Sequence, residues 1–289
     1  MRNKLTKFFL RCGLGLFKII PFWLLYRLSD GLYYLLYYVL RIRRKVVRNN
    51  IQFAFPDKPL AERILIEKKS YRNFCDVILE SVKGFSMTPQ QLAKRYLTPP
   101  GGIDHYFEEK KSVVAFMAHF NNWEWGTSIQ LNLKHKAFFI YKRLHNRGAD
   151  ELIRQRRAAC GAELIYKEQV ARTLIRNRRT PSFYAVIADQ RPSSDQEQRT
   201  VTLFNRQITC FAGPEMIAKT FGMVVLYSKI ERIKRGYYRA SPVVITEDPK
   251  NTEEGYISQQ CFSLLEAQIR EHPGHWMWMH KRFKGLDRE

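Results

Sequence analysis

The chain has 289 residues, of which 45% are hydrophobic and 13% aromatic, and its formal net charge is +22. This length and composition exclude a disordered chain and favour one α/β domain with appendages over two domains. A charge this basic implies an anionic partner: nucleic acid, an anionic membrane surface, an acidic protein or a phosphorylated substrate. The five scattered cysteines include no Cys-x2-Cys pair, which indicates a reducing compartment without a disulfide framework or structural zinc.

The first 50 residues concentrate the positive charge, with 11 Lys or Arg residues and one acidic residue, Asp30. The longest uncharged run, residues 31–40, has ten residues, about half of what a bilayer span needs. Aromatic residues and a basic flank at 41–45 favour a helical hairpin in or on the membrane, with bends at Pro21 and Gly31. The alternative is a pair of amphipathic helices packed in a soluble core. A cleaved signal peptide is not expected.

From residue 48 to 97 the apolar spacing is helical, with a helix start at Pro59, and residues 99–102 then break the chain. We therefore predict two units, a membrane-anchoring helical segment at 1–45 and the main domain at 46–289. In the main domain, expected strands alternate with expected helices, which predicts an α/β fold with a mostly parallel sheet flanked by helices. The expected strands are 113–118, 137–141, 162–166, 182–188 and 223–230, and the expected helices are 123–133, 150–160, 169–178 and 214–221.

The stretch from Ala115 to Trp125 indicates chemistry at a strand-to-helix corner. An apolar run ends at His119, and Asn121 or Asn122 can cap a helix that carries Glu124 in its first turn. A corner of this kind brings imidazole and carboxylate within reach, so that Glu124 would orient His119 as a general base. The alternative is a strand-end histidine beside a capping carboxylate. A zinc site is not expected, because no second histidine follows at helical spacing.

Two further segments carry polar residues that the fold could bring to the same site. Asp189 and Gln190 follow the strand expected at 182–188, and sites in open parallel sheets lie at the carboxyl ends of strands. The segment 272–284 alternates Trp and Met residues, which is typical of an edge strand or an extended lid, or else of an aromatic closure of the core. No glycine-rich phosphate loop is present, which counts against a nucleotide enzyme.

Several of these pieces resemble one family, the bacterial lipid A biosynthesis acyltransferases, within the lysophospholipid acyltransferase group. His119-Phe-Asn-Asn-Trp-Glu124 is similar to the family's His-x4-Asp/Glu hallmark, and Asp189-Gln190 to its strand-end Asp-Gln. Residues 211–218 are similar to its Gly-Pro-Ala-type helix start, and residues 276–283 to its closing Trp-x-Trp-x-His-x-Arg segment. The family usually has Gly where Asn121 stands, and the loop after Gln190 is shorter here, which leaves the acceptor open.

The resemblance implies an O-acyltransferase that moves an acyl chain from an acyl carrier protein or acyl-CoA thioester to a hydroxyl of an anionic lipid. A lipid A precursor is the expected acceptor; another glycolipid or an aminolipid is the alternative. His119 and Glu124 are the expected catalytic residues, and no metal or cofactor is implied. The expected substrate-binding residues are Asn121 and Asn122 as oxyanion donors, Arg143, Arg157 and Arg191 as phosphate anchors, and Asp189 and Gln190.

A charge-based rival is a membrane-peripheral nucleic-acid-binding protein. No binding motif accompanies the charge, and its clustering near the N-terminus does not supply a basic stripe, so nucleic acid is not an expected partner. If the basic flank follows the positive-inside tendency, the expected location is the inner membrane, with the catalytic domain on the cytoplasmic face.

Overall fold

The computed structural model describes residues 13–193 and 197–283. The first 12 residues of the predicted anchoring segment, with Cys12, lie outside the described residues. Residues 13–19 are helical, and Pro21 then precedes the helix α2 (Phe22–Tyr34), which continues into a short π-helix, η1 (Leu35–Val39). The bend at Pro21 is therefore confirmed.

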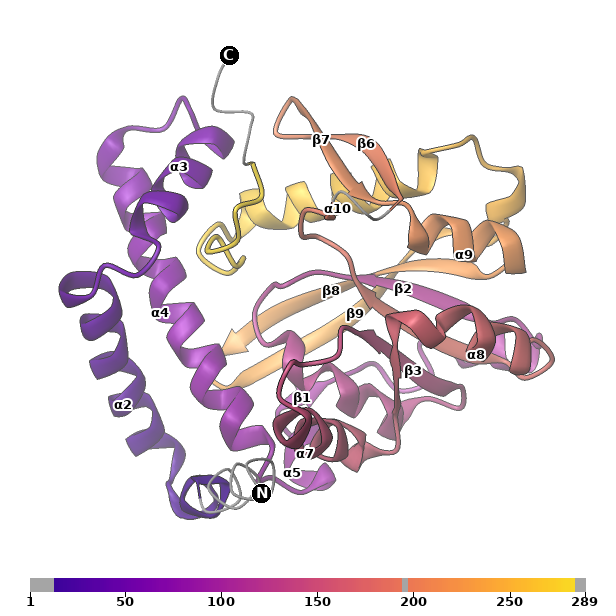
Figure 1. Ribbon diagram of the computed structural model, residues 1–289, viewed down its shortest axis with the longest axis horizontal. Coiled ribbons are helices and arrows are strands. Elements are labelled where there is room, and N and C mark those ends of the chain that lie inside the picture. The colour runs from indigo at the N-terminus through magenta and orange to yellow at the C-terminus, as the bar shows by residue number, and fades with distance from the viewer. Residues whose placement is uncertain (1–12, 194–196, 284–289) are drawn as a thin grey trace.

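The predicted bend at Gly31 is wrong, because α2 runs through this residue. A glycine inside a helix costs about 1 kcal/mol, and packing against the neighbouring helix α4 (Leu60–Gly84) offsets it. Tyr33 and Tyr37 are buried, and the ring of Tyr37 lies 5.1 Å from that of Tyr71 on α4. Figure 1 shows α2 running alongside α4 at the edge of the molecule. In the part of the chain that the structure describes, no helix combines the length and apolarity needed to cross a bilayer.

The main domain is built on a seven-stranded sheet with the order β1-β9-β8-β2-β5-β3-β4. All neighbouring pairs are parallel except β8 and β9, which are antiparallel. The prediction of an α/β fold with a mostly parallel sheet is confirmed. The strands are β1 (Tyr96–Leu97), β2 (Val113–Met117), β3 (Lys136–Tyr141), β4 (Glu163–Tyr166), β5 (Ser182–Ile187), β8 (Val224–Lys234) and β9 (Tyr237–Thr246).

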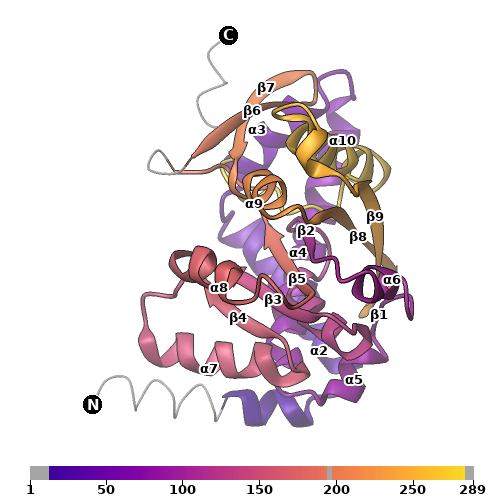
Figure 2. The same ribbon diagram turned by 90° about the vertical axis from the view of Figure 1, so that its right-hand side faces the viewer.

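Helices cover both faces of this sheet (Figure 2). Among the described residues, the helices before the sheet include, besides residues 13–19, α2, η1 and α4, the helices α3 (Arg44–Ala54) and α5 (Pro89–Ala93). The later α-helices are α6 (Asp104–Glu108), α7 (Arg147–Arg157), α8 (Val170–Arg176), α9 (Gly213–Phe221) and α10 (Tyr256–Glu271). The 3₁₀ helices are η2 (Trp123–Asn132), η3 (Ala158–Cys160), η4 (Lys167–Gln169) and η5 (Pro249–Asn251).

Strand β2 shows why the apolar run at 113–117 becomes the centre of the sheet. Its five residues are all buried, as expected for a parallel strand covered on both faces. Because side chains alternate along a strand, Val114 and Phe116 face the cluster formed with α10, whereas Ala115 and Met117 face the cluster formed with η2 and α6. The carboxyl end of β2 is therefore enclosed by helices on two sides.

Two antiparallel features were not predicted from the sequence. β8 turns into β9 through Arg235 and Gly236, whose φ of 75° suits glycine. A separate hairpin, β6 (Gln198–Leu203) and β7 (Arg206–Phe211), turns at Phe204 and Asn205, both with positive φ. Two residues with positive φ are typical of a tight hairpin turn, and the Phe204–Asn205 pair is a weaker sequence signal than Asn-Gly.

Candidate active site

The site begins where two neighbouring strands end. β2 and β5 are parallel neighbours, with Met117 opposite Ile187, so the chain places His119 and Asp189 side by side two residues later. The Nδ1 atom of His119 lies 2.7 Å from Oδ1 of Asp189. Sites in open parallel sheets form at this carboxyl edge, and the predicted convergence of the two strand ends is confirmed.

Asp189 is held by a complete set of donors. Its side chain is 2% exposed; its Oδ2 accepts from the backbone N–H of His119 at 3.0 Å and from the indole N–H of Trp276 at 2.8 Å. Burial by itself would raise the pKa of the Asp189 carboxyl, but the positive charge available on His119 and the donated hydrogen bonds lower it. Asp189 is therefore an ionised acceptor that fixes the imidazole.

The second ring nitrogen of His119 faces a cavity. With Nδ1–H donating to Asp189, Nε2 keeps its lone pair, and the side-chain nitrogen of Gln190 lies 3.4 Å away. The His119 side chain is 19% exposed, and the ring of Trp123 packs against it edge-on at 4.9 Å. An imidazole with one nitrogen oriented by a carboxylate and the other open to a cavity has the arrangement of a general base.

The predicted hydrogen bond between His119 and Glu124 is wrong. The Nδ1 atom of His119 pairs with Asp189, and the Glu124 carboxylate instead forms a bidentate ion pair with Arg157, at 2.6 and 2.7 Å. The cause lies at Asn121, whose left-handed φ of 51° turns the chain before η2 begins. Glu124 therefore joins η2 to α7, and two of the three guanidinium nitrogens of Arg157, a predicted phosphate anchor, are occupied.

Asn121 and Asn122 support the turn from inside the protein. Both are fully buried: Asn121 donates to the carbonyl of Ile230, and Asn122 caps η2 through the N–H of Trp125 and donates to Glu80. Their predicted roles as side-chain oxyanion donors are not supported by these positions, because neither amide is exposed to a substrate. Asn122 is the N-cap of η2.

Glu80 on α4 was not singled out from the sequence. Its buried carboxylate accepts from the hydroxyls of Tyr26 and Tyr238 as well as from Asn122, and burial raises its pKa. The spacing of apolar residues on α4 gives no signal for this role, because Glu80 lies among residues that read as ordinary scaffold. The network links α2, α4 and β9 to the active-site turn.

The closing segment packs over the end of β2. Trp276 forms an isolated antiparallel bridge with Phe120, the N–H of Met277 donates to the carbonyl of His119, and the N–H of Asn121 donates to the carbonyl of His275. Trp276 and Trp278 are both buried. Of the alternatives for this segment, aromatic closure of the core therefore describes it better than an edge strand, although Trp276 also touches the site through Asp189.

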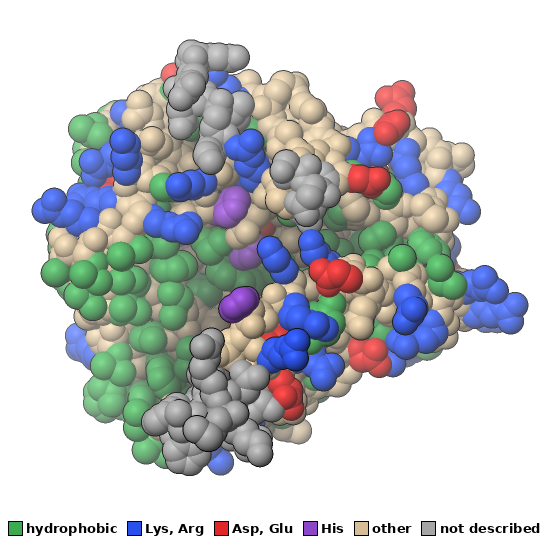
Figure 3. Space-filling model, in the orientation of Figure 1, with side chains coloured by type: hydrophobic (Ala, Val, Ile, Leu, Met, Phe, Trp, Pro, Cys, Tyr) green, Lys and Arg blue, Asp and Glu red, His purple; other side chains and the backbone are tan. Residues whose placement is uncertain are grey.

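The cavity beside His119 has a volume of about 610 Å³, within the range of small-molecule sites. Its wall is mostly apolar and comes from β3, β5, α8, β7 and α9, including Ile140, Val186 and Ile217. Lys142, Lys167 and Arg191 also line it, and sequence reasoning had found only Arg191 of these three. Arg143, another predicted anchor, stacks on Tyr166 at 4.0 Å. Figure 3 shows histidines in a hollow at the centre of one face, with Lys and Arg beside it.

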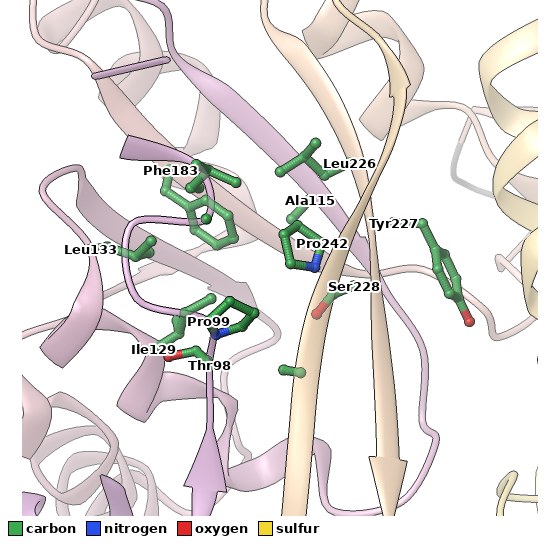
Figure 4. Close-up of a pocket in the computed structure, with 13 residues that line it drawn as sticks. Thr98, Pro99, Ala115, Ile129, Leu133, Phe183, Leu226, Tyr227, Ser228 and Pro242 are labelled. Carbon is green, nitrogen blue, oxygen red and sulfur yellow. The ribbon is translucent and has the colours of Figure 1, made fainter. Parts of the chain in front are cut away.

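A second cavity lies away from this chemistry. Figure 4 shows that apolar side chains of β2, β5 and β8 surround it, among them Ala115, Phe183 and Leu226. Its volume is about 30 Å³, which is room for about one water molecule. It is a packing gap on the η2 side of the sheet.

A family model for the bacterial lipid A biosynthesis acyltransferases matches residues 2–285. The chain belongs to this family. A relative named lipid A biosynthesis acyltransferase, from Haemophilus influenzae, is 22% identical over 254 residues, which cover 84% of this chain and 78% of that protein. Membership of the family makes this chain an acyltransferase, and the His119–Asp189 pair beside a largely apolar cavity is its candidate active site.

Proposed function

We propose that this acyltransferase moves a fatty acyl chain from a thioester to a hydroxyl of an anionic membrane lipid, a lipid A precursor, without an acyl-enzyme. The observation that carries the proposal is the His119–Asp189 pair, with Nε2 of His119 open to a largely apolar cavity of about 610 Å³. Apolar walls suit the acyl chain, and the imidazole suits removal of a proton from a hydroxyl.

In the proposed reaction, Nε2 of His119 takes the proton of the acceptor hydroxyl as its oxygen attacks the thioester carbonyl. The C–S bond then breaks, and the leaving thiolate takes the proton back from the imidazolium. Asp189 stabilises the charged imidazole between these steps. Backbone N–H groups at the start of η2 are the candidate oxyanion donors, because the first N–H groups of a helix lack intrahelical partners.

Charge around the cavity favours phosphorylated partners. Lys142, Lys167 and Arg191 line it against one acidic residue, Glu197, and the chain as a whole carries +22. An acyl carrier protein is acidic and a CoA thioester carries phosphates, so either donor fits this charge. The same cations suit the phosphate of an anionic acceptor.

Membrane association forms part of the proposal. Trp23, Tyr34 and Val39 on the α2–η1 segment are 68%, 58% and 69% exposed, and hydrophobic side chains gather on the side of the molecule where α2 lies (Figures 1 and 3). Exposed aromatic and aliphatic side chains beside basic residues suit a lipid headgroup boundary. We assign the protein to the inner membrane, with the catalytic domain on the cytoplasmic face.

The catalytic proposal is tested with His119→Ala, assayed with an acyl thioester and a detergent-dispersed lipid acceptor, and with product measured by mass spectrometry. Loss of the base should lower kcat by about 10² to 10⁴, while the melting temperature stays unchanged. His105→Ala is the matched control, because His105 is exposed on α6 and does not line the cavity. Retention of more than about a tenth of wild-type turnover by His119→Ala would contradict the general-base role.

Membrane association is tested by substitution instead of truncation, because deleting residues 1–40 would also remove the buried side chains of Leu25, Tyr33 and Tyr37. Trp23→Ser with Val39→Ser should move the protein from the membrane fraction without lowering its melting temperature. Leu60→Ser with Leu131→Ser changes two exposed residues elsewhere and serves as the control. Equal membrane fractions for both pairs would contradict the anchoring role of this segment.

A further inference from the structure

A pocket of about 590 Å³ lies between α2, α4 and the β8–β9 turn, and it has no lining residue in common with the cavity beside His119. We refer to it as the α2–α4 pocket. Five cationic and two acidic side chains line it, a net charge of +3. Figure 1 shows the two helices side by side along this edge of the molecule.

Two of its cations are neutralised within the protein. The buried carboxylate of Asp76 accepts from Arg232 at 2.8 Å and from Arg235 at 2.6 Å, and Arg235 also pairs with Asp30 at 2.7 Å. Asp76 accepts from Ser29 as well. These contacts join α2, α4 and the β8–β9 turn around the pocket, so that its shape is set by partly buried ion pairs centred on the buried Asp76.

The remaining cations are not neutralised. In the described ranges, no carboxylate pairs with Arg27, Lys69 or Arg72, all of which are exposed. Arg72 lies over the ring of Tyr33 at 4.9 Å, which orients its planar guanidinium. His275 lines the same pocket, and its buried Nδ1 atom has no hydrogen-bond partner in this part of the structure.

The pKa of His275 is consistent with a positive electrostatic potential in the pocket. Burial lowers the pKa of its imidazole to about 4, and the charges of Arg232, His272 and Lys69 act in the same direction. A phosphate in the pocket would place negative charge among these groups. Arginine binds phosphate through a planar fork of N–H donors, and lysine binds it as a point charge.

The side of α2 next to the pocket indicates where that phosphate comes from. Trp23, Arg27 and Tyr34 are spaced at i, i+4 and i+11, which places them on one face of the helix. Trp23 and Tyr34 are more than half exposed, and the ring of Tyr34 stacks on that of Tyr38 at 5.6 Å. A cation between exposed aromatic rings is the arrangement found where a helix meets lipid headgroups.

We propose that the α2–α4 pocket binds the phosphate headgroup of an anionic bilayer lipid that is not the acyl acceptor, through Arg27, Lys69 and Arg72. The tails of that lipid would lie along the exposed aromatic face of α2. This inference rests on the proposed membrane association and goes beyond it, because it assigns a built site for one lipid, apart from the catalytic cavity.

The test uses the full chain and sedimentation with vesicles of phosphatidylcholine, with or without phosphatidylglycerol. Arg27→Gln with Arg72→Gln should weaken binding to the phosphatidylglycerol vesicles roughly ten- to thirty-fold, from about a factor of five for each cation near an anionic surface. Arg178→Gln with Arg179→Gln is the matched control, since both residues are exposed and follow α8 on the opposite side of the molecule from α2 (Figure 1). Both pairs should keep the wild-type melting temperature and turnover on detergent-dispersed acceptor.

An equal loss of vesicle binding for the two pairs of substitutions would overturn the proposal, because the positive charge of the whole protein, and not the α2–α4 pocket, would then explain the binding. Stabilisation by inorganic phosphate of the wild type but not of the Arg27/Arg72 pair, with unchanged vesicle binding, would assign the pocket to free phosphate and also overturn it. Wild-type protein that binds neither kind of vesicle would refute membrane association itself. Turnover on detergent-dispersed acceptor tests the catalytic proposal separately.

Discussion

Replacing Asp189 by Asn tests which carboxylate orients His119. The Oδ2 atom of Asp189 receives two N–H donors, from the His119 backbone and from Trp276, at 3.0 and 2.8 Å. An asparagine must turn its oxygen toward these two donors, so its NH2 group faces Nδ1 of His119. Nδ1 then becomes the acceptor and Nε2 carries the proton, and the neutral imidazole can no longer take a proton from a hydroxyl.

The expected loss follows from this tautomer. General-base catalysis is worth about 10² to 10⁴ in rate, and the equivalent Asp→Asn change in the serine-protease triad costs about 10⁴. We expect kcat of Asp189→Asn to fall by at least about 10², with little change in the KM of the acceptor. The acidic limb of the pH–rate profile should also move to lower pH, because the protonated imidazole loses its negative neighbour.

The assay is steady-state turnover of an acyl thioester and a detergent-dispersed acceptor across pH, with melting temperatures to establish folding. Glu124→Gln is the comparison, because it removes a carboxylate of the same turn that pairs with Arg157 and not with His119. The acidic limb of the pH–rate profile of Glu124→Gln should stay at the wild-type pH, even if its kcat falls. Asp189→Asn with turnover within about tenfold of wild type, or a limb shift in Glu124→Gln as large as in Asp189→Asn, would refute the assignment.

Three further predictions concern the surroundings of the site. Glu124→Gln and Arg157→Gln should each lower activity, and the double variant should be little less active than the weaker of the two single variants, because the residues act as one ion pair. Additive losses of activity in a double-mutant cycle would contradict this coupling. Glu80→Ala should lower the free energy of unfolding by roughly 2–4 kcal/mol in urea titrations, since two buried donors and one partly buried donor lose their acceptor. Glu62→Ala, on the exposed side of α4, should change it by no more than about 0.5 kcal/mol, and similar effects of the two substitutions would argue against the network. Burial lowers the folded-state pKa of His275 from 6.5 to about 4, so the unfolded chain takes up this proton first, and the free energy of unfolding should fall by roughly 2 kcal/mol as the pH drops from 6.5 to 4. His275→Gln should flatten this dependence on pH, and an unchanged slope would contradict the burial of the imidazole.

The sequence by itself determined the fold class of the protein and the positions of several strands and helices. The apolar run at 113–118 predicts a strand, and the structure has the fully buried strand β2 over Val113–Met117. Pro21 predicts a bend because proline lacks an N–H, and the helix α2 begins directly after it. His119 and Asp189 each follow an expected strand, and sites in open parallel sheets lie at the carboxyl ends of strands, so the sequence indicated that both residues could reach one site.

Only the tertiary structure decided which groups pair at that edge. Glu124 is five residues from His119 and Asp189 is seventy, yet Asp189 holds the imidazole because β5 lies beside β2 in the sheet. Local sequence gives no strand order, and it did not reveal the left-handed Asn121 that turns Glu124 toward Arg157. Hydrogen bonds depend on a few tenths of an ångström between atoms, and those distances are fixed by the packing of distant segments.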